Sequence, residues 1–264
     1  MTVTDVNVVK SAIFERPDDA NKGTLGSLLC VCGSYGMAGA AVMSAKGALR
    51  TGIGLAKCAL PRSIYPIVAQ TILESVYYPL NENADGRISK VNVPFLVSES
   101  CKSSATLVGC GLGVCDDTLK IVFSLIENST TPLVLDADAL NCVAKQPEIL
   151  LRKKAPIIIT PHPGEMSRLT GLATPLVNAE RERVALDFAQ KYGVVTVVKG
   201  AGTVIASPNG KVLVNPTGNS GMATGGSGDV LAGMTASILA QGASAFSSAA
   251  AAVYLQGFEG DIAA

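Results

Sequence analysis

The chain has 264 residues, of which 48% are hydrophobic and 16% charged, which supplies ample material for a buried core and argues against disorder. Its 21 basic residues balance 21 acidic ones, and a formal net charge of zero argues against nucleic-acid or anionic-membrane partners. No secretory signal or apolar stretch long enough to cross a bilayer is evident, which predicts a soluble protein. The scattered cysteines, which we expect to be reduced thiols, predict a cytoplasmic one.

Short apolar runs alternate with helical patterns along the chain. Strands are predicted at 27–34, 54–61, 105–111, 132–138, 155–160 and 194–200, and helices at 38–52, 63–72, 116–127, 137–151 and 176–192. Because the strand runs are apolar on both faces, we expect an α/β fold with a mainly parallel central sheet flanked by helices on both faces.

The pattern changes after the last of these strands. Residues 202–216 contain two strand-like runs about a Pro-Asn-Gly turn, which predicts a β-hairpin, and apolar helices are expected at 226–241 and 243–259. The polar stretch 81–98 is interpreted as a surface excursion. Without a linker-like change of composition, residues 1–264 are expected to form a single domain.

The seven cysteines lie mostly inside apolar runs, and no two of them form a Cys-x-x-Cys pair. Because the chain has a single histidine, a zinc site of His and Cys ligands is nearly excluded. We expect reduced, buried thiols, with a metal or redox role as the less favoured alternative.

Several predicted strands end in residues of unusual chemistry. Ligands of open parallel sheets bind outside the carboxyl ends of the strands, so these segments are expected to converge at one edge. The segments are "GSYGMAGA" (33–40), "GCGLG" (109–113), "DADALN" (136–141) and "TPHPGE" (160–165).

The glycine-rich run "NPTGNSGMATGGSGDVLAGM" precedes a helix and is expected at the same edge. Gly225, Gly226, Ser227 and Gly228 would let the unpaired N–H groups of the first helical turn approach an anion, which predicts a phosphate cradle. Asp229 could then accept a proton from a substrate hydroxyl beside the phosphate being transferred. The alternative is that Ser227 or Asp229 only caps the helix.

Other polar residues at the strand ends leave two interpretations open. His162 could contact a ligand or bond a local carbonyl, and it has no evident partner for a hydrolase triad. Glu165 could cap the helix that begins there or hold a metal through water. Asp136 and Asp138 could bind magnesium or be solvated turn carboxylates. Lys199 precedes a glycine turn that could approach a flat ring or a phosphate, or it could be a solvated hairpin residue.

Taken in order and spacing, "GSYGMAGA", "GLG", "DADALN", "TPHPGEMSRLTG", "VVKGAGTVI" and "NPTGNSGMATGGSGDVLAG" resemble the ADP/ATP-dependent NAD(P)H-hydrate dehydratases. The resemblance runs from about residue 25 to the last residue and implies a ribokinase-like fold with the hairpin near a nucleotide site. It implies a lyase of metabolite repair. By this resemblance, a nucleotide would phosphorylate the C6 hydroxyl of hydrated NADH or NADPH (NADHX or NADPHX), and phosphate would then leave to regenerate the cofactor.

The resemblance also implies roles for individual residues. Asp229 would be the base and Gly228 would line the phosphate path. The remaining positions fall into three groups: Lys199, Gly200, Ala201, Gly202 and Thr203 with Gly228 at the nucleotide; Ala40, Gly113, His162 and Asp229 at the hydrated dinucleotide; Asn141 and Glu165 as secondary contacts. Mg²⁺ with ADP or ATP, a homotetramer and a separate NAD(P)HX epimerase are further implications. Cys110 and Gln256 depart from the pattern, which has proline and histidine there in many relatives.

Three alternatives remain at this point. A small-molecule kinase of the same fold, acting on a vitamin or thiazole alcohol, would share Asp229 and the anion cradle. A nicotinamide-dependent oxidoreductase is disfavoured because "GSYGMAGA" lacks the G-x-G-x-x-G spacing. A nucleotide-binding sensor without turnover would have no need of a base at Asp229.

Overall fold

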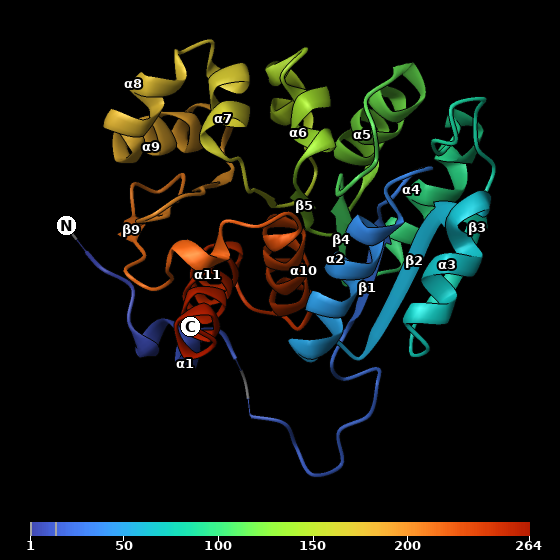
Figure 1. Ribbon diagram of the computed structural model, residues 1–264, viewed down its shortest axis with the longest axis horizontal. Helices are drawn as coiled ribbons and strands as arrows, with labels where there is room; N and C mark the ends of the chain where they lie inside the picture. The colour runs from blue at the N-terminus through green and yellow to red at the C-terminus, as the bar shows by residue number, and fades with distance from the viewer. Residues whose placement is uncertain (1, 14) are drawn as a thin grey trace.

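One mixed sheet of nine strands forms the centre of the protein, in the order β3-β2-β1-β4-β5-β6-β7-β8-β9 (Figure 1). The computed structural model describes residues 2–13 and 15–264. The parallel strands are β1 (Ser27–Val31), β2 (Leu55–Pro61), β3 (Val76–Leu80), β4 (Ala105–Val108), β5 (Leu133–Leu135), β6 (Ile157–Ile159) and β7 (Val195–Val198). The antiparallel strands β8 (Val204–Ala206) and β9 (Val212–Val214) form the predicted hairpin.

Helices cover both faces of this sheet, which confirms the predicted α/β architecture (Figure 1). One face carries α1 (Val6–Ala12), α2 (Ala38–Arg50), α3 (Tyr65–Thr71), α10 (Ser227–Ala240) and α11 (Ala245–Ile262). The other carries α4 (Val93–Cys101), α5 (Asp116–Asn128), α6 (Asp138–Val143), α7 (Pro163–Thr170), α8 (Thr174–Ala179) and α9 (Arg181–Tyr192).

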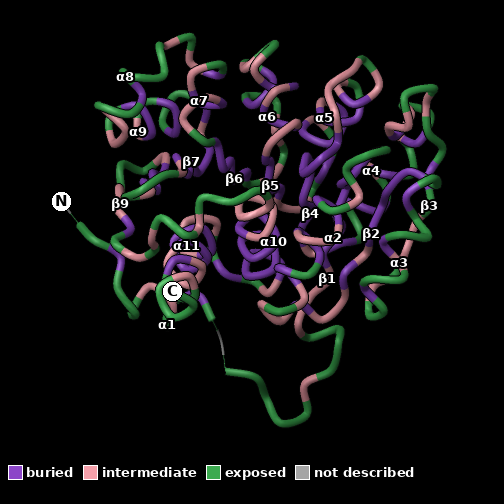
Figure 2. Tube along the Cα trace, viewed as in Figure 1, coloured by how far each residue is buried: buried purple, intermediate pink, exposed green. Residues whose placement is uncertain are grey.

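The alternation of side chains along each strand explains why the protein has two hydrophobic core clusters, one on each face of the sheet. Leu28 and Cys30 of β1 pack in the cluster under α2 and α10, whereas Leu29 and Val31 pack in the cluster under α5. Successive side chains of a strand point to opposite faces, so a strand that is apolar at every position requires a cover on both sides. Figure 2 shows the central strands buried and the exposed residues concentrated in loops and outer helices.

The structure corrects several predicted boundaries. The expected surface excursion 81–98 is wrong in its second half, because α4 begins at Val93 and buries Leu96 and Ser100. The expected helix 137–151 is divided into α6 and a 3₁₀ segment, Pro147–Arg152, since proline cannot continue a helix. The expected helix 176–192 is likewise divided into α8 and α9 at Glu180.

Close packing of α2 against α10 sets the position of the glycine-rich run. A Cβ atom added to Gly233 would lie 2.0 Å from the carbonyl oxygen of Ser44, and one added to Gly47 would lie 2.8 Å from that of Val230. Glycine at both positions lets the two backbones approach, and α10 also packs on β1 and β4. These neighbouring strands form the switch point of the topology, where α/β proteins bind ligands.

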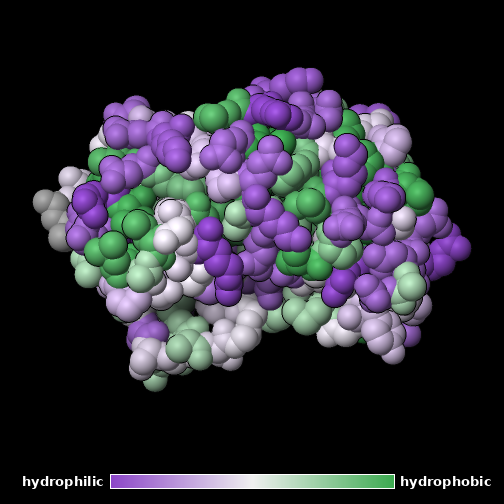
Figure 3. Space-filling view, turned by 90° about the horizontal axis from the view of Figure 1, so that it is seen from above, coloured by the Kyte–Doolittle hydropathy of each residue, from purple (hydrophilic) through white to green (hydrophobic). Residues whose placement is uncertain are grey.

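The surface seen from above is mostly polar (Figure 3). Figure 3, which views the molecule from above, shows hydrophilic side chains interspersed with smaller hydrophobic areas. Among the residues that the structure describes, no helix combines the length and the hydropathy needed to cross a membrane.

Candidate active site

The four predicted segments converge at one edge of the sheet. Past the ends of the strands, backbone hydrogen bonds continue to hold neighbouring segments together at 2.8–3.2 Å: Gly33 with Cys110, Gly109 with Val31, Asp136 with Val108, Thr160 with Leu135, and Lys199 with Pro161. The expectation that these strand ends meet is therefore confirmed.

Asp136, directly after β5, is the centre of this edge. Its side chain is almost completely buried, with the residue 1% exposed. Oδ1 accepts hydrogen bonds from Thr160 Oγ1 at 2.8 Å and from Lys199 Nζ at 2.7 Å. Oδ2 accepts a long bond, 3.8 Å, from the thiol of Cys110. One carboxylate thus joins groups that follow β4, β5, β6 and β7.

Lys199 lies inside this polar cluster. Its ammonium group bonds Asp136 and lies 4.0 Å from Glu165 Oε2, with the lysine side chain 18% exposed. Burial opposes the charge of Lys199, but the two carboxylates outweigh that effect and raise its pKa. The alternative of a solvated hairpin lysine is wrong.

Asp229 enters the cluster from the first turn of α10. One side-chain ligand atom from each of Asp229, Asp136 and Cys110 lies within 4.8 Å of the other two. Burial, followed by the negative charge of Asp136, raises the pKa of the half-buried Asp229 from its ordinary value to about 6. A carboxyl group that titrates near neutrality is suited to proton transfer.

The N-terminus of α10 carries no side-chain cap. Its N-cap residue is Gly226, with φ +93°, and no side chain caps the N–H groups of the first turn. Among the described residues, the backbone N–H groups of Gly228 and Asp229 have no hydrogen-bond acceptor. The alternative that Ser227 or Asp229 caps the helix is therefore wrong, and unpaired donors are available to an anion.

The glycines at the start of α10 differ in how much room a Cβ atom would have at each position. A Cβ atom on Gly225 would meet nothing within 4 Å, whereas one on Gly228 would lie 3.3 Å from Lys199 Nζ. The backbone of Gly228 therefore faces a positive charge. Gln256 Nε2 donates to the carbonyl oxygen of Ser227 at 2.7 Å and anchors this turn to α11.

His162 and Glu165 form a reciprocal cap at the start of α7. His162 Nδ1 accepts from the N–H groups of Gly164 (3.0 Å) and Glu165 (3.4 Å), and Glu165 Oε2 accepts from the N–H of His162 (2.8 Å). Burial, then Lys199, lowers the pKa of His162, so its ring is neutral near pH 7. Burial raises the pKa of Glu165. The capping interpretation of Glu165 is confirmed.

The side chain of Asp138 makes a separate set of hydrogen bonds beside the cluster of Asp136, Lys199 and Asp229. Its Oδ2 accepts from the N–H of Gly113 at 2.8 Å, and its Oδ1 accepts from Asn141 Nδ2 at 3.3 Å. Between the two aspartates, Ala137 has φ +49°, a conformation that costs a non-glycine residue about 1–3 kcal/mol. Asp138 is thus more than a solvated turn carboxylate. Ala40 lies at the same edge, where it limits the space around Gly111.

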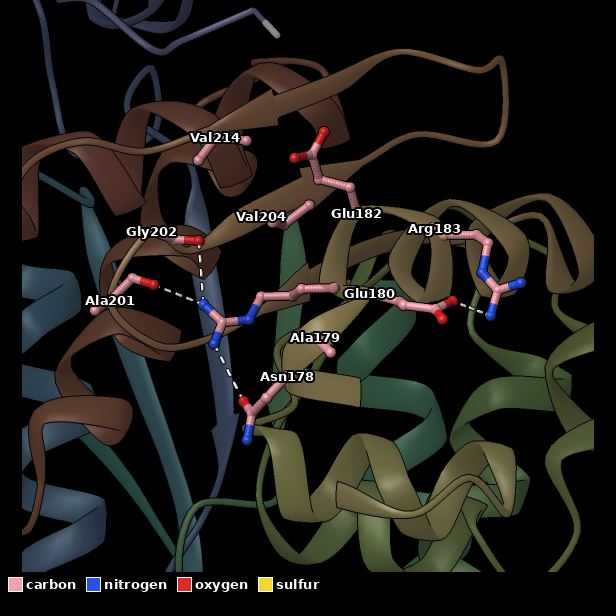
Figure 4. A pocket seen from close by; sticks show the side chains of 10 residues that line it. Asn178, Ala179, Glu180, Glu182, Arg183, Ala201, Gly202, Val204 and Val214 are labelled. Carbon is pink, nitrogen blue, oxygen red and sulfur yellow. Dashed lines mark hydrogen bonds and ion pairs between the residues drawn. The ribbon is translucent and has the colours of Figure 1, made fainter. Parts of the chain in front are cut away.

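The glycine turn after β7 lies beside a cavity of about 490 Å³ (Figure 4). Arg181 holds this turn by donating to the carbonyl oxygens of Ala201 (2.7 Å) and Gly202 (3.2 Å). Thr203 Oγ1 closes the turn through a 2.8 Å bond to the carbonyl oxygen of Gly200. The cavity is lined by residues 178–183 and by Ala201, Gly202, Val204 and Val214.

Some functional contacts had no signal in the sequence. Arg181 lies in a charged helical stretch, and nothing there marks it as a partner of residues twenty positions later. Thr160 is a single hydroxyl at a strand end. In the sequence, Cys110 stands out only as the residue between two glycines in "GCGLG" and as a departure from the family pattern, and neither feature indicates its contact with Asp136.

A mainly parallel α/β sheet with a carboxylate at an uncapped helix N-terminus, above the switch point, fits a ribokinase-like protein. The nine-strand fold matches a ribokinase-like protein from Enterococcus faecalis with a TM-score of 0.85 at 24% identity. The family model for NAD(P)H-hydrate dehydratase matches residues 28–264, and the chain belongs to this family.

Sequence relatives agree with this assignment. A bifunctional NAD(P)H-hydrate repair enzyme from Moorella thermoacetica is 38% identical over 255 residues, which cover 97% of this chain and 48% of that protein. An ADP-dependent (S)-NAD(P)H-hydrate dehydratase from Neisseria meningitidis is 35% identical over 250 residues, with 94% and 80% covered. The chain spans about half the length of the bifunctional relatives.

Solved structures give the same result. The ADP/ATP-dependent NAD(P)H-hydrate dehydratase from Bacillus subtilis, co-crystallised with ATP/Mg²⁺, superposes with a TM-score of 0.82 at 31% identity, covering 97% of this chain and 87% of the other. A hydroxyethylthiazole kinase from Pyrococcus horikoshii, at 13% identity and a TM-score of 0.58, shares the fold alone. The predicted family resemblance and ribokinase-like fold are confirmed.

The ion pair of Lys199 generates a stability prediction. Lys199→Met leaves the buried Asp136 without its cation, which should lower the free energy of unfolding at pH 7 by about 3 kcal/mol. The matched control Lys90→Met removes an exposed lysine 4.0 Å from Asp117 and should change it by less than about 1 kcal/mol. Denaturant unfolding measures both, and equal losses in the two variants would contradict the account.

Proposed function

We propose that this protein dehydrates NADHX and NADPHX to NADH and NADPH with ADP or ATP as co-substrate. The observation that carries the proposal is the half-buried carboxylate of Asp229 beside unpaired N–H groups in the first turn of α10. Family membership supports the substrate class, since the relatives carry this activity in their names.

The chemistry begins at the C6 hydroxyl of the hydrated ring. Asp229 takes the hydroxyl proton while the oxygen forms a bond to the terminal phosphorus of the nucleotide and the bond to the bridging oxygen breaks. The C6–O bond then breaks, inorganic phosphate departs with the former hydroxyl oxygen, and the neighbouring ring carbon loses a proton to restore the double bond. Unpaired N–H groups of α10 would stabilise the charge that develops on the phosphoryl oxygens.

Each ligand occupies its own part of the edge in this proposal. The nucleotide lies against the turn from Lys199 to Thr203, which Arg181 holds, and against Gly228. Its phosphates follow the cradle of residues 225–228 toward Asp229. The hydrated dinucleotide contacts Ala40, Gly113 and His162, with Asn141 and Glu165 as secondary contacts. The bond from the Gly113 N–H to Asp138 would fix that side of the site.

Magnesium fits the donor chemistry of the site. Carboxylates of Asp136, Asp138, Glu165 and Asp229 gather there against the ammonium of Lys199, and Mg²⁺ prefers oxygen ligands. Asp136 and Asp138 would hold the ion together with nucleotide phosphates and water. When bound, it would neutralise charge on those phosphates.

We also infer a single domain for residues 1–264, a homotetramer, a cytoplasmic location and a metabolic link to an NAD(P)HX epimerase. A largely apolar groove of about 480 Å³ between α2, α10 and α11 supports association between copies. The mass of the protein in solution tests the tetramer, and a monomeric mass would overturn it.

The proposed activity has a direct assay. Purified protein is mixed with NADHX, Mg²⁺ and either ADP or ATP, and absorbance of reduced nicotinamide is followed together with free phosphate. We expect nucleotide-dependent recovery of NADH with one phosphate released per NADH formed. Intact nucleotide binding without recovery would contradict the dehydratase and favour a kinase of the same fold, which would retain a stable phosphorylated product.

The role of Asp229 has a separate test. Asp229→Asn should keep nucleotide affinity and lower kcat by about 10²–10⁴-fold, the usual contribution of a general base. Because the pKa of Asp229 is raised to about 6, its carboxylate is protonated at lower pH, and kcat/KM of the unsubstituted enzyme should fall as pH drops through about 6. A pH-independent rate, or full turnover by Asp229→Asn, would remove Asp229 as the base.

The cradle predicts a steric effect on nucleotide binding. Gly228→Val places a side chain toward Lys199 in the first turn of α10, which should obstruct the approach of a phosphate and weaken nucleotide binding at least tenfold in equilibrium titration. Gly225→Ala, whose Cβ would meet nothing within 4 Å, is the comparison within the same cradle and should weaken binding less than Gly228→Val does. Unaltered affinity in Gly228→Val would count against the cradle.

A further inference from the structure

We propose that Cys110, Asp136 and Asp229 form an inhibitory binding site for a thiophilic divalent cation such as Zn²⁺. The site shares the carboxylate of Asp229 with the proposed dehydratase reaction, so its effect on activity rests on that proposed function. Cation binding itself is independent of it.

Geometry is the first support. The three side chains offer one sulfur and two carboxylate oxygens, all within 4.8 Å of one another. Zinc bonds of about 2.0–2.3 Å place tetrahedral ligand atoms about 3.3–3.8 Å apart. Closing the site therefore needs shifts of about 1 Å, which side chains can supply without moving the strands.

The second support is that the carboxylate oxygens facing the site are available to coordinate an ion. Asp136 Oδ1 already accepts from Thr160 and Lys199, whereas Oδ2 accepts only the long bond of the Cys110 thiol among the described residues. The Cys110 thiol also lies within hydrogen-bonding reach of the Asp229 carboxylate, and this bond would give way when the thiol loses its proton to a bound cation. Both oxygens can therefore coordinate an ion without breaking a shorter bond.

Charge and access also favour a cation. Asp138 and Glu165 add negative charge near the site. The ammonium of Lys199 bonds Asp136 Oδ1, whereas the Cys110 thiol bonds Oδ2. Cys110 is fully buried, but Asp229 is half-buried and Gly225 is exposed, so the ion enters over the first turn of α10.

A thiol selects among cations. Thiolate ligands favour zinc and cadmium, whereas magnesium takes oxygen ligands and gains nothing from sulfur. On binding, the S–H bond of Cys110 breaks, its proton passes to solvent, and the sulfur electron pair forms the bond to the cation. No oxidant or reductant takes part. With the ion bound, Asp229 cannot accept the substrate proton, and the proposed reaction stops.

The test uses Cd²⁺ as a probe, because cadmium–thiolate bonds absorb in the ultraviolet. Cys101 and Cys115, the cysteines that are not buried, are first replaced by alanine in the full chain to remove competing thiols. Titration of this protein with Cd²⁺ should produce a charge-transfer band that saturates at one ion per chain. No band, or one that does not saturate, would overturn the proposal.

Cys110→Ala in the same background should abolish the band, and Cys142→Ala, which removes another buried thiol, should leave it unchanged. Cys110→Ser gives a second variant of nearly native volume should the alanine protein fail to fold. A band that persists in both Cys110 variants would contradict the site. In the activity assay, the Zn²⁺ concentration for half inhibition should rise at least about tenfold in whichever Cys110 variant folds. An unchanged value in an active variant would also contradict it.

Discussion

The carboxylate of Asp136 is almost fully buried, and a charge in such a place is tolerated only where partners compensate it. Here the compensation comes from Thr160 and Lys199, which follow two other strands of the sheet. Satisfying one charge therefore fixes the relative positions of several strand ends. The remaining field of Asp136 acts on Asp229, whose pKa it helps to raise. One interaction thus contributes both to the shape of the site and to the readiness of its proposed base.

The first turn of α10 adds a second constraint. Helix termini normally satisfy their N–H groups with a side chain, yet Gly226 offers none and the donors of Gly228 and Asp229 stay unpaired among the described residues. The tight packing of α2 on α10, which depends on Gly47 and Gly233, holds this turn over the strand ends. Glycines in the run thus serve helix packing at one place and close approach of the backbone at another.

Much of the fold could be predicted from the sequence because its strands are apolar on both faces. Hydrophobic runs such as "PLVLDAD" and "APIIIT" require cover on both sides, and their polar ends must meet at one edge. The edge strand β3 escaped prediction because four of its five residues are exposed or half-exposed and one of them is Pro79, a residue that strands tolerate mainly at an edge. Helix α4 was missed because two of its three buried residues, Glu99 and Ser100, are polar, so it shows little apolar periodicity.

The position of the candidate site could be predicted from the sequence, but the side-chain contacts within it could not. Asp229 and the glycines before it were recognisable from helix physics and from the family resemblance. Contacts between residues far apart in the chain had no such marker: the approach of Cys110 to Asp136 and Asp229, or the hold of Arg181 on the turn after β7. Those depend on side-chain directions that only the assembled sheet and helices determine.

The central claim is that the C6 hydroxyl oxygen leaves as part of the phosphate. NADHX labelled with ¹⁸O in that hydroxyl separates this route from every other dehydration. Mass spectrometry of the phosphate released with ADP or ATP should find one ¹⁸O atom per phosphate, in step with NADH formation. Label recovered in water, with unlabelled phosphate, would mean that the hydroxyl departs without being phosphorylated, and the proposed role of Asp229 and the α10 cradle would be contradicted.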